Sequence, residues 1–209
     1  MKTENHTPIF ITGAERSGST FIAKILDLCG TKFGDCNGMY ENKSIVALNN
    51  KILFSYDDRF PPMGELQIPI SWKDTILSVY EEEIKTGVWF VKHSTLARLW
   101  PLYHYAFPNA KWIIVRRRTG DIIKSCLKTG YMKEYGTEEG WLSWVHKYEE
   151  SFIEMMQAGV NCKIIWPERM VTGDYTQIFE MVDWLGVKWN YRIPSVIDPL
   201  LIKSREELK

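Results

Sequence analysis

The segment PIFITGAERSGSTFIAKILDLCG, residues 8–30, decides the fold prediction for this chain. Its first five residues, PIFIT, form a short apolar run that ends at Gly13 and is typical of a buried strand. The loop GAERSGST follows, and residues 19–30 then carry apolar side chains at helical spacing as far as Gly30. A strand, a glycine-rich turn and a helix in this order predict a loop that binds an anion at the helix N-terminus.

The rest of the chain alternates predicted strands with predicted helices. Apolar runs indicate further buried strands at 88–91, 111–115 and 163–166. Amphipathic spacing and boundary residues indicate helices at 44–54, 72–87, 101–110, 120–130, 138–159 and 174–186. For the last helix we expect Asp174 to cap the start and Gln177 to reach back to it. This alternation predicts one α/β domain over residues 1–209, a three-layer sandwich with a central parallel sheet and helices on both faces.

Composition limits the partners that this chain is expected to have. The 209 residues have a net charge of +0, so no basic surface suggests a nucleic-acid partner. The four cysteines form no Cys-x-x-Cys pair and have no histidines at metal-binding spacing, so we expect reduced thiols and no metal site. The N-terminal segment is polar, and no apolar run has the length of a membrane span. We therefore expect a soluble, cytoplasmic protein without a membrane partner, and the sequence does not indicate an oligomeric state.

The loop differs from that of nucleoside triphosphatases in its cation. The triphosphatase loop has Lys directly after the second glycine, where this chain has Ser19, and it works with a strand-end Asp that holds Mg²⁺. Here the nearest cation is Arg16, inside the loop, and the other predicted strands run into VKH, VRR and WPE. This pattern favours an anionic donor that side chains neutralise, although a metal-dependent P-loop kinase is an alternative.

Residues 10–21, FITGAERSGSTF, resemble the phosphosulfate loop of the sulfotransferase superfamily, which reads P-[KR]-S-G-T-T in many members. The resemblance implies a fold like that of the P-loop nucleotide hydrolases. It also implies that the 5′-phosphosulfate of 3′-phosphoadenosine 5′-phosphosulfate (PAPS) is held by Arg16, Ser17, Gly18, Ser19 and Thr20. Phe21 stands where cytosolic members often have a Trp that stacks on adenine, and Phe can also stack.

Two later segments agree with this resemblance. KWIIVRRRTGDIIKSCL, residues 111–127, is similar to the family's 3′-phosphate segment, in which R-x-P-x-D follows a strand and a Ser lies eight places after the Arg. In that register Arg117 and Ser125 would bind the 3′-phosphate, although Thr119 replaces the Pro. The C-terminal segment IIWPERMVTGDYTQIFEMVDWLGV resembles the family's closing strand, acidic turn and helix, with Glu168 in the acidic place.

The resemblance also implies catalytic residues. FVKHSTL, residues 90–96, resembles the family's K-T-H-L strand end and its bacterial K-D-P counterpart, so Lys92 would contact the sulfuryl group and Arg16 the leaving phosphate. The general base is either Glu41, placed after the first helix as in many bacterial members, or His93. His93 follows Lys92 by one residue where the family pattern has two, and strand alternation would turn it to the other face.

We therefore expect a PAPS-dependent sulfotransferase that transfers a sulfuryl group to a hydroxyl or amine by in-line displacement without a metal. Residues 31–75 would form the acceptor site or a lid. The nine Trp and ten Tyr are read first as core residues and second as walls for a small-molecule or carbohydrate acceptor. The alternatives are the metal-dependent kinase and a non-catalytic protein that binds 3′-phosphoadenosine 5′-phosphate (PAP).

Overall fold

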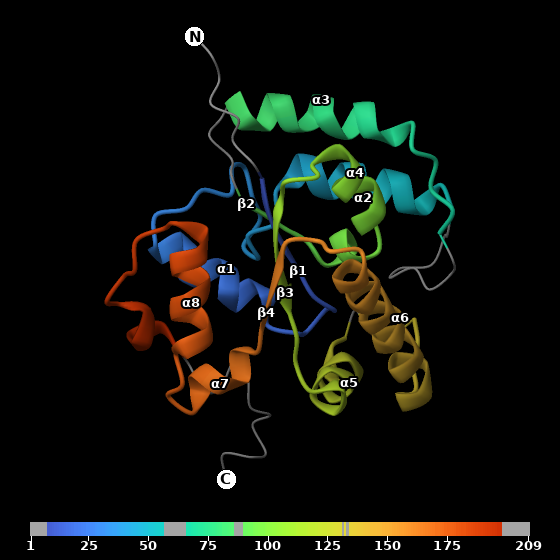
Figure 1. Ribbon diagram of the computed structural model, residues 1–209. Coiled ribbons are helices and arrows are strands. Elements are labelled where there is room, and N and C mark those ends of the chain that lie inside the picture. The colour runs from blue at the N-terminus through green and yellow to red at the C-terminus, as the bar shows by residue number, and fades with distance from the viewer. Residues whose placement is uncertain (1–7, 57–65, 86–89, 131, 133, 198–209) are drawn as a thin grey trace.

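A computed structural model describes residues 8–56, 66–85, 90–130, 132 and 134–197 of the chain (Figure 1). Within them, a four-stranded parallel sheet has the strand order β2-β1-β3-β4. The strands are β1 (Ile9–Thr12), β2 (Phe90–Lys92), β3 (Lys111–Val115) and β4 (Cys162–Ile165). This arrangement confirms the predicted parallel sheet.

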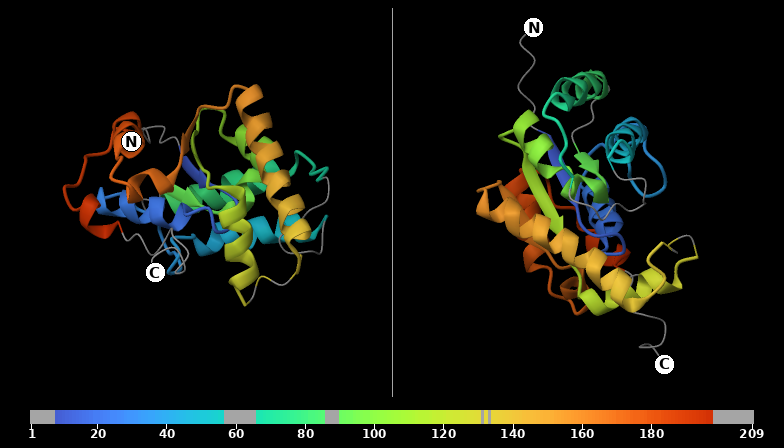
Figure 2. Two further views of the ribbon diagram at one scale, coloured as in Figure 1. Left: turned by 90° about the horizontal axis from the view of Figure 1, so that it is seen from below. Right: turned by 90° about the vertical axis from the view of Figure 1, so that its right-hand side faces the viewer.

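Helices cover both faces of the sheet, as Figures 1 and 2 show, and confirm the three-layer α/β fold. One face carries α1 (Ser19–Leu28), α7 (Pro167–Val171) and α8 (Thr176–Leu185). The other carries α2 (Lys43–Phe54), α3 (Trp72–Lys85), α4 (Trp100–Ala106), α5 (Thr119–Lys128) and α6 (Glu138–Gln157). Two short 3₁₀ turns are η1 (Ser94–Ala97) and η2 (Ile193–Val196). Among the helices of the described segments, none is long and apolar enough to cross a membrane.

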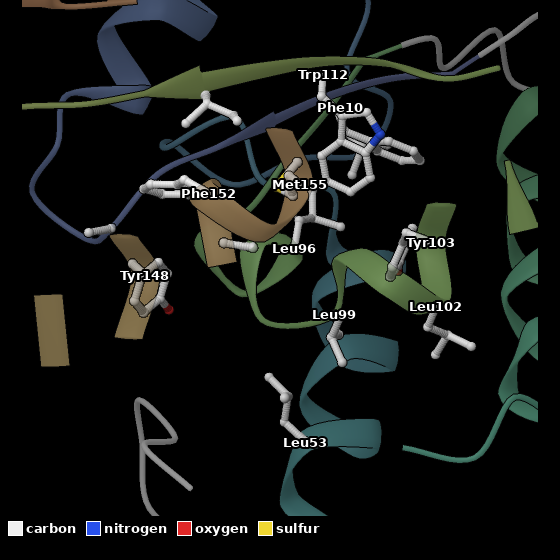
Figure 3. Close-up of a cluster of buried hydrophobic side chains, with 14 of the residues drawn as sticks. Phe10, Leu53, Leu96, Leu99, Leu102, Tyr103, Trp112, Tyr148, Phe152 and Met155 are labelled. Carbon is white, nitrogen blue, oxygen red and sulfur yellow. The ribbon is translucent and has the colours of Figure 1, made fainter. Parts of the chain in front are cut away.

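The alternation of side chains along the central strands explains the two apolar cores. Phe10 and Trp112 face the larger core, where their rings lie 4.6 Å apart, while Ile11 and Ile113 face the smaller one under α1 and α8. Figure 3 shows aromatic side chains of the larger core, which include Tyr103, Tyr148 and Phe152. The buried tryptophans and tyrosines therefore serve packing, as the first reading of the composition predicted.

Strand order places the candidate site at the carboxyl ends of the two central strands, β1 and β3. The chain leaves β1 for β2 on one side and later returns to β3 on the other side of β1. In open parallel sheets, such a reversal opens a crevice at the carboxyl ends of the two strands, where ligands bind. The loop after β1 (residues 13–18) and the three arginines after β3 (116–118) both lie there.

Several predicted boundaries need correction. Helix α4 ends at Ala106, two residues before Pro108, near which the sequence predicted its end. Residues 86–89, which were predicted to end α3 and begin β2, lie outside the described part of the chain. The backbone N–H of Thr176 donates to Asp174, but Gln177 accepts from the backbone N–H of Trp166 and so does not reach back to the start of α8. The short α7 was not predicted, although Pro167 at its first turn is a known start signal.

Candidate active site

The loop after β1 is a tight turn that depends on its glycines. A Cβ at Gly13 would lie 2.4 Å from the carbonyl oxygen of Val115 and 2.5 Å from Ser17 Oγ, so only glycine fits there without a shift. Arg16 and Gly18 have φ values of 67° and 94°, the left-handed region that glycine adopts easily and other residues rarely. The loop is therefore held against the end of β3, and its backbone turns before α1 begins.

The start of α1 offers hydrogen-bond donors to a ligand. Gly18 is the N-cap residue and has no side chain to satisfy the first N–H groups of the helix. Ser17 is 1% exposed, and its Oγ has no hydrogen-bond partner among the described residues. Buried polar groups are nearly always paired, so an unpaired hydroxyl beside uncapped N–H groups suits an anionic ligand. Ser19 and Thr20 form the first turn of the same helix and are partly exposed.

Three residues predicted for the donor site come together in the structure. Arg16 Nε donates a 2.8 Å hydrogen bond to Ser125 Oγ on α5, across 109 positions of sequence. Arg117 Nη1 donates to the backbone carbonyl of Arg16 at 3.2 Å, across 101 positions. Two guanidinium groups and a hydroxyl thus meet where β1 and β3 end, which is the arrangement that phosphate recognition needs.

The three arginines after β3 have different surroundings. Arg116 forms an ion pair with Glu149 on α6, and Arg118 keeps 70% of its side chain exposed. Arg117 keeps only 12% exposed, and its Nε lies 3.8 Å from a carboxylate oxygen of Glu168. The prediction that selected Arg117 from this run stays untested by any ligand, but Arg117 does contact the loop, through the backbone carbonyl of Arg16.

Glu41 and Lys92 form a partly buried ion pair. Lys92 Nζ lies 2.7 Å from Glu41 Oε1, and the two side chains are 5% and 14% exposed. Asn37 also donates to Glu41, at 2.9 Å. Burial favours the neutral form of Glu41, but the charge and hydrogen bond of Lys92 outweigh it and hold the pKa of Glu41 below its ordinary value. The two predicted catalytic residues therefore lie side by side, although 51 positions separate them.

His93 is buried just after β2. Its Nδ1 hydrogen bonds with Thr95 Oγ1, and Asn49 Nδ2 on α2 lies 3.5 Å from the same nitrogen. Burial lowers the pKa of His93 to about 4, so the ring is neutral at neutral pH. A catalytic role for His93 stays a prediction, and its contacts tie the strand end to α2.

Phe21 lies in the smaller core. It is 5% exposed and packs with the apolar residues under α1 and α8. Its predicted stacking on adenine is untested, and this burial leaves little of the ring surface for a ligand.

Sequence reasoning missed Glu15, the acidic residue inside the loop. Ser94 Oγ donates a 2.6 Å hydrogen bond to Glu15 Oε1, while Glu15 Oε2 is buried and has no partner among the described residues. Burial raises the pKa of Glu15 to about 7. The available signal was an acid in a loop that is otherwise built to attract anions.

The comparison with known families agrees with this geometry. The sequence model of the Sulfotransferase family matches residues 8–190, a range that contains all the site residues above. The chain belongs to the sulfotransferase family. No curated protein matches its sequence.

Solved structures show the same fold for this sulfotransferase. The sulfotransferase domain of the Synechococcus PCC 7002 olefin synthase aligns with a TM-score of 0.56 at 15% identity, covering 100% of this chain and 91% of that one. Sulfotransferase STF9 from Mycobacterium avium aligns with a TM-score of 0.58 at 13% identity, covering 92% of this chain and 67% of that one. At these identities the likeness supports the fold and does not assign a substrate.

Proposed function

We propose that this sulfotransferase transfers a sulfuryl group from PAPS to a hydroxyl or amine of a small-molecule or carbohydrate acceptor. The observation that carries the proposal is the meeting of Arg16, Arg117 and Ser125 at the carboxyl ends of β1 and β3. Family membership supports the reaction class, and sulfotransferases generally use PAPS.

The donor site fits a nucleotide with two separate phosphate groups. Ser17, Ser19 and Thr20, with the N–H groups at the start of α1, would hold the 5′-phosphosulfate, since Ser17 Oγ lacks a partner among the described residues and no side chain caps the start of α1. Arg117 and Ser125 would hold the 3′-phosphate. Arg16, which belongs to the loop and donates to Ser125, would stabilise the charge on the leaving phosphate oxygen.

Glu41 and Lys92 provide the base and the cation for the transfer. In the free protein Lys92 keeps Glu41 ionised, which makes Glu41 a weak base. An anionic sulfuryl group near Lys92 would compete for its ammonium group. Burial would then raise the pKa of Glu41, and Glu41 could accept the proton of the acceptor hydroxyl or amine as the new bond to sulfur forms. The products are the sulfated acceptor, PAP and a proton on Glu41.

The acceptor pocket is proposed along residues 31–75. The described part of this segment places Glu41 beside Lys92 and packs α2 against the larger core. Residues 57–65 lie outside the described part of the chain. No single acceptor follows from these contacts, so the proposal names the chemical class only.

Calorimetric titration tests the donor proposal. We expect PAP to bind at micromolar concentration without a divalent metal and ATP with Mg²⁺ to bind weakly. Tight, metal-dependent ATP binding without a response to PAP would instead support the kinase alternative. PAP binding without sulfuryl transfer from PAPS to any member of a hydroxyl and amine acceptor panel would support a non-catalytic PAP-binding protein.

A further inference from the structure

The carboxyl group of Glu15 is the one feature of the loop that opposes anion binding. Part of the residue is exposed, but the carboxyl is buried between η1 and the loop, with Oε1 accepting from Ser94 Oγ. Arg16, the next residue, extends to Ser125 on α5. An ionised Glu15 would therefore place a negative charge in the same short loop that holds the donor.

Ser94, which donates to this carboxyl, is itself held in position by a hydrogen bond from β1. The backbone carbonyl of Ser94 accepts a 3.0 Å hydrogen bond from Thr12 Oγ1 at the end of β1, and Ser94 itself is 8% exposed. Ser94 follows β2 by two residues, so the hydrogen bond to Glu15 joins the loop after β1 to the chain after β2. The carboxyl therefore has one fixed side-chain donor on Oε1, whereas Oε2 is sealed from solvent without a partner among the described residues.

Two charged side chains act on Glu15 in opposite directions. Lys92 at the end of β2 favours the ionised carboxylate, and Glu41, which pairs with Lys92, opposes it. Cys126 on α5 and Tyr148 on α6 also interact with the charge of Glu15, but burial keeps the pKa of both groups high, so both stay neutral near pH 7 and add no negative charge. Burial is the largest influence on Glu15 and leaves its pKa near 7, in the range where a small change of environment alters its protonation.

We propose that Glu15 takes up a proton from solvent when the anionic nucleotide binds the loop, so that the loop that holds the donor contains a neutral carboxylic acid. The inference rests on the proposed donor function. A bound phosphosulfate brings negative charge next to Glu15 and disfavours its ionised form, as a second carboxylate would. The new O–H bond removes the one negative charge that the loop itself contributes.

The sign of the pH effect follows from this linkage. Nucleotide binding raises the pKa of Glu15 above its free value near 7, so affinity is fully present below pH 7 and falls as the pH rises toward the bound value. The limiting slope for one proton is about tenfold per pH unit. Glu15→Gln, which mimics the neutral acid, should bind PAP at least as tightly as the wild type at pH 8.5 and should lack this slope.

Isothermal titration of PAP into the full chain tests the proposal. Titrations at pH 7.5 in buffers of different ionisation enthalpy give the number of protons taken up, and Glu15→Gln serves as the reference because PAP titrates its own phosphates equally in both proteins. We expect the wild type to take up about half a proton more than the variant. Between pH 7 and 8.5 the wild type should lose about three- to tenfold more affinity than the variant.

Two further variants provide a control and a second test of proton uptake by Glu15. Glu149→Gln is the matched control, because Arg116 already holds that carboxylate on α6, and it should leave proton uptake unchanged. Ser94→Ala removes the hydrogen bond that favours ionised Glu15, so it should reduce uptake at pH 7.5 even if Glu15→Gln folds poorly. Equal uptake and equal pH slopes in the wild type, Glu15→Gln and Ser94→Ala would overturn the proton linkage while leaving the donor site intact. No PAP binding by the wild type would overturn the donor site itself.

Discussion

The donor side and the acceptor side of this site are built in different ways. The donor side combines a strand, a tight loop and a helix that follow one another in sequence, with a second such unit after β3. The acceptor side depends on a contact between Glu41 and Lys92, which lie 51 positions apart and meet in a partly buried ion pair. Local patterns therefore define the donor side, whereas tertiary packing defines the acceptor side. The predictions below separate these two sides.

The largest effect is expected for Arg16→Ala on the donor side. Arg16 links the loop to Ser125 and is the cation nearest the proposed leaving phosphate, so its loss should lower kcat/KM for PAPS by about 10³-fold. PAP affinity measured by calorimetry should fall as well. Steady-state sulfuryl transfer with a saturating acceptor checks the rate.

Arg118→Ala is the control for charge at the same strand end. Its side chain is 70% exposed, and exposed ion pairs are worth roughly 1 kcal/mol or less, so kcat/KM should change about fivefold at most. If Arg16→Ala turned over at the rate of this control, the loop would not have the role proposed for it.

Glu41→Gln should lower the rate of transfer, which depends on the acceptor side, and leave nucleotide binding on the donor side nearly unchanged. Loss of a general base lowers kcat by about 10²-fold, while PAP affinity should change little because Glu41 contacts Lys92 and Asn37 and not the loop. Single-turnover rates with preformed enzyme and PAPS separate this chemical step from binding.

His93→Gln distinguishes the rival base. Because the ring is buried against Thr95 and Asn49, we expect a lower melting temperature and a nearly unchanged single-turnover rate in the molecules that fold. A normal rate in Glu41→Gln together with a hundredfold loss in His93→Gln would transfer the role of base to His93.

Gly13→Ala tests the packing of the donor loop and should have a smaller effect. The added Cβ would lie 2.4 Å from the carbonyl oxygen of Val115, so the backbone of the loop or of β3 has to shift. Forced repacking of this kind costs about 1–3 kcal/mol of unfolding free energy. Urea denaturation measures that cost. Gly120→Ala is the control, because a Cβ at Gly120 would meet nothing within 4 Å.

The sequence alone could predict the donor side better than the acceptor side, because its signals act over a few residues. Apolar periodicity and Gly13 placed β1, the loop and α1 correctly because each signal acts within a few residues. Arg117 was selected from three arginines by its register, and the structure brings it to the loop. The same local register could not choose between Glu41 and His93, since their surroundings are made by α2 and the end of β2, which are distant in sequence.

Glu15 was missed for a related physical reason. A carboxylate in a loop is usually interpreted as a solvated charge, but this one is buried and accepts a hydrogen bond from Ser94, 79 positions away. The capping contact of Gln177 was predicted wrongly for the same reason, because Trp166 from the preceding strand end competes for its side-chain oxygen. Side-chain partners that arrive from other elements decide both cases.

Phe21→Leu should have the smallest effect on the donor side, and it tests the predicted adenine-stacking residue, which the structure buries in an apolar core. If Phe21 stacked on adenine, its loss would weaken PAP binding by about 1–3 kcal/mol, or roughly five- to 150-fold. Its ring is 5% exposed in the core under α1 and α8, so we expect a change of threefold or less in PAP affinity, along with a modest loss of stability from imperfect repacking of about 1 kcal/mol. Calorimetry with PAP and urea denaturation measure the two quantities on the same variant. A large loss of affinity with unchanged stability would mean that the ring leaves the core when nucleotide binds.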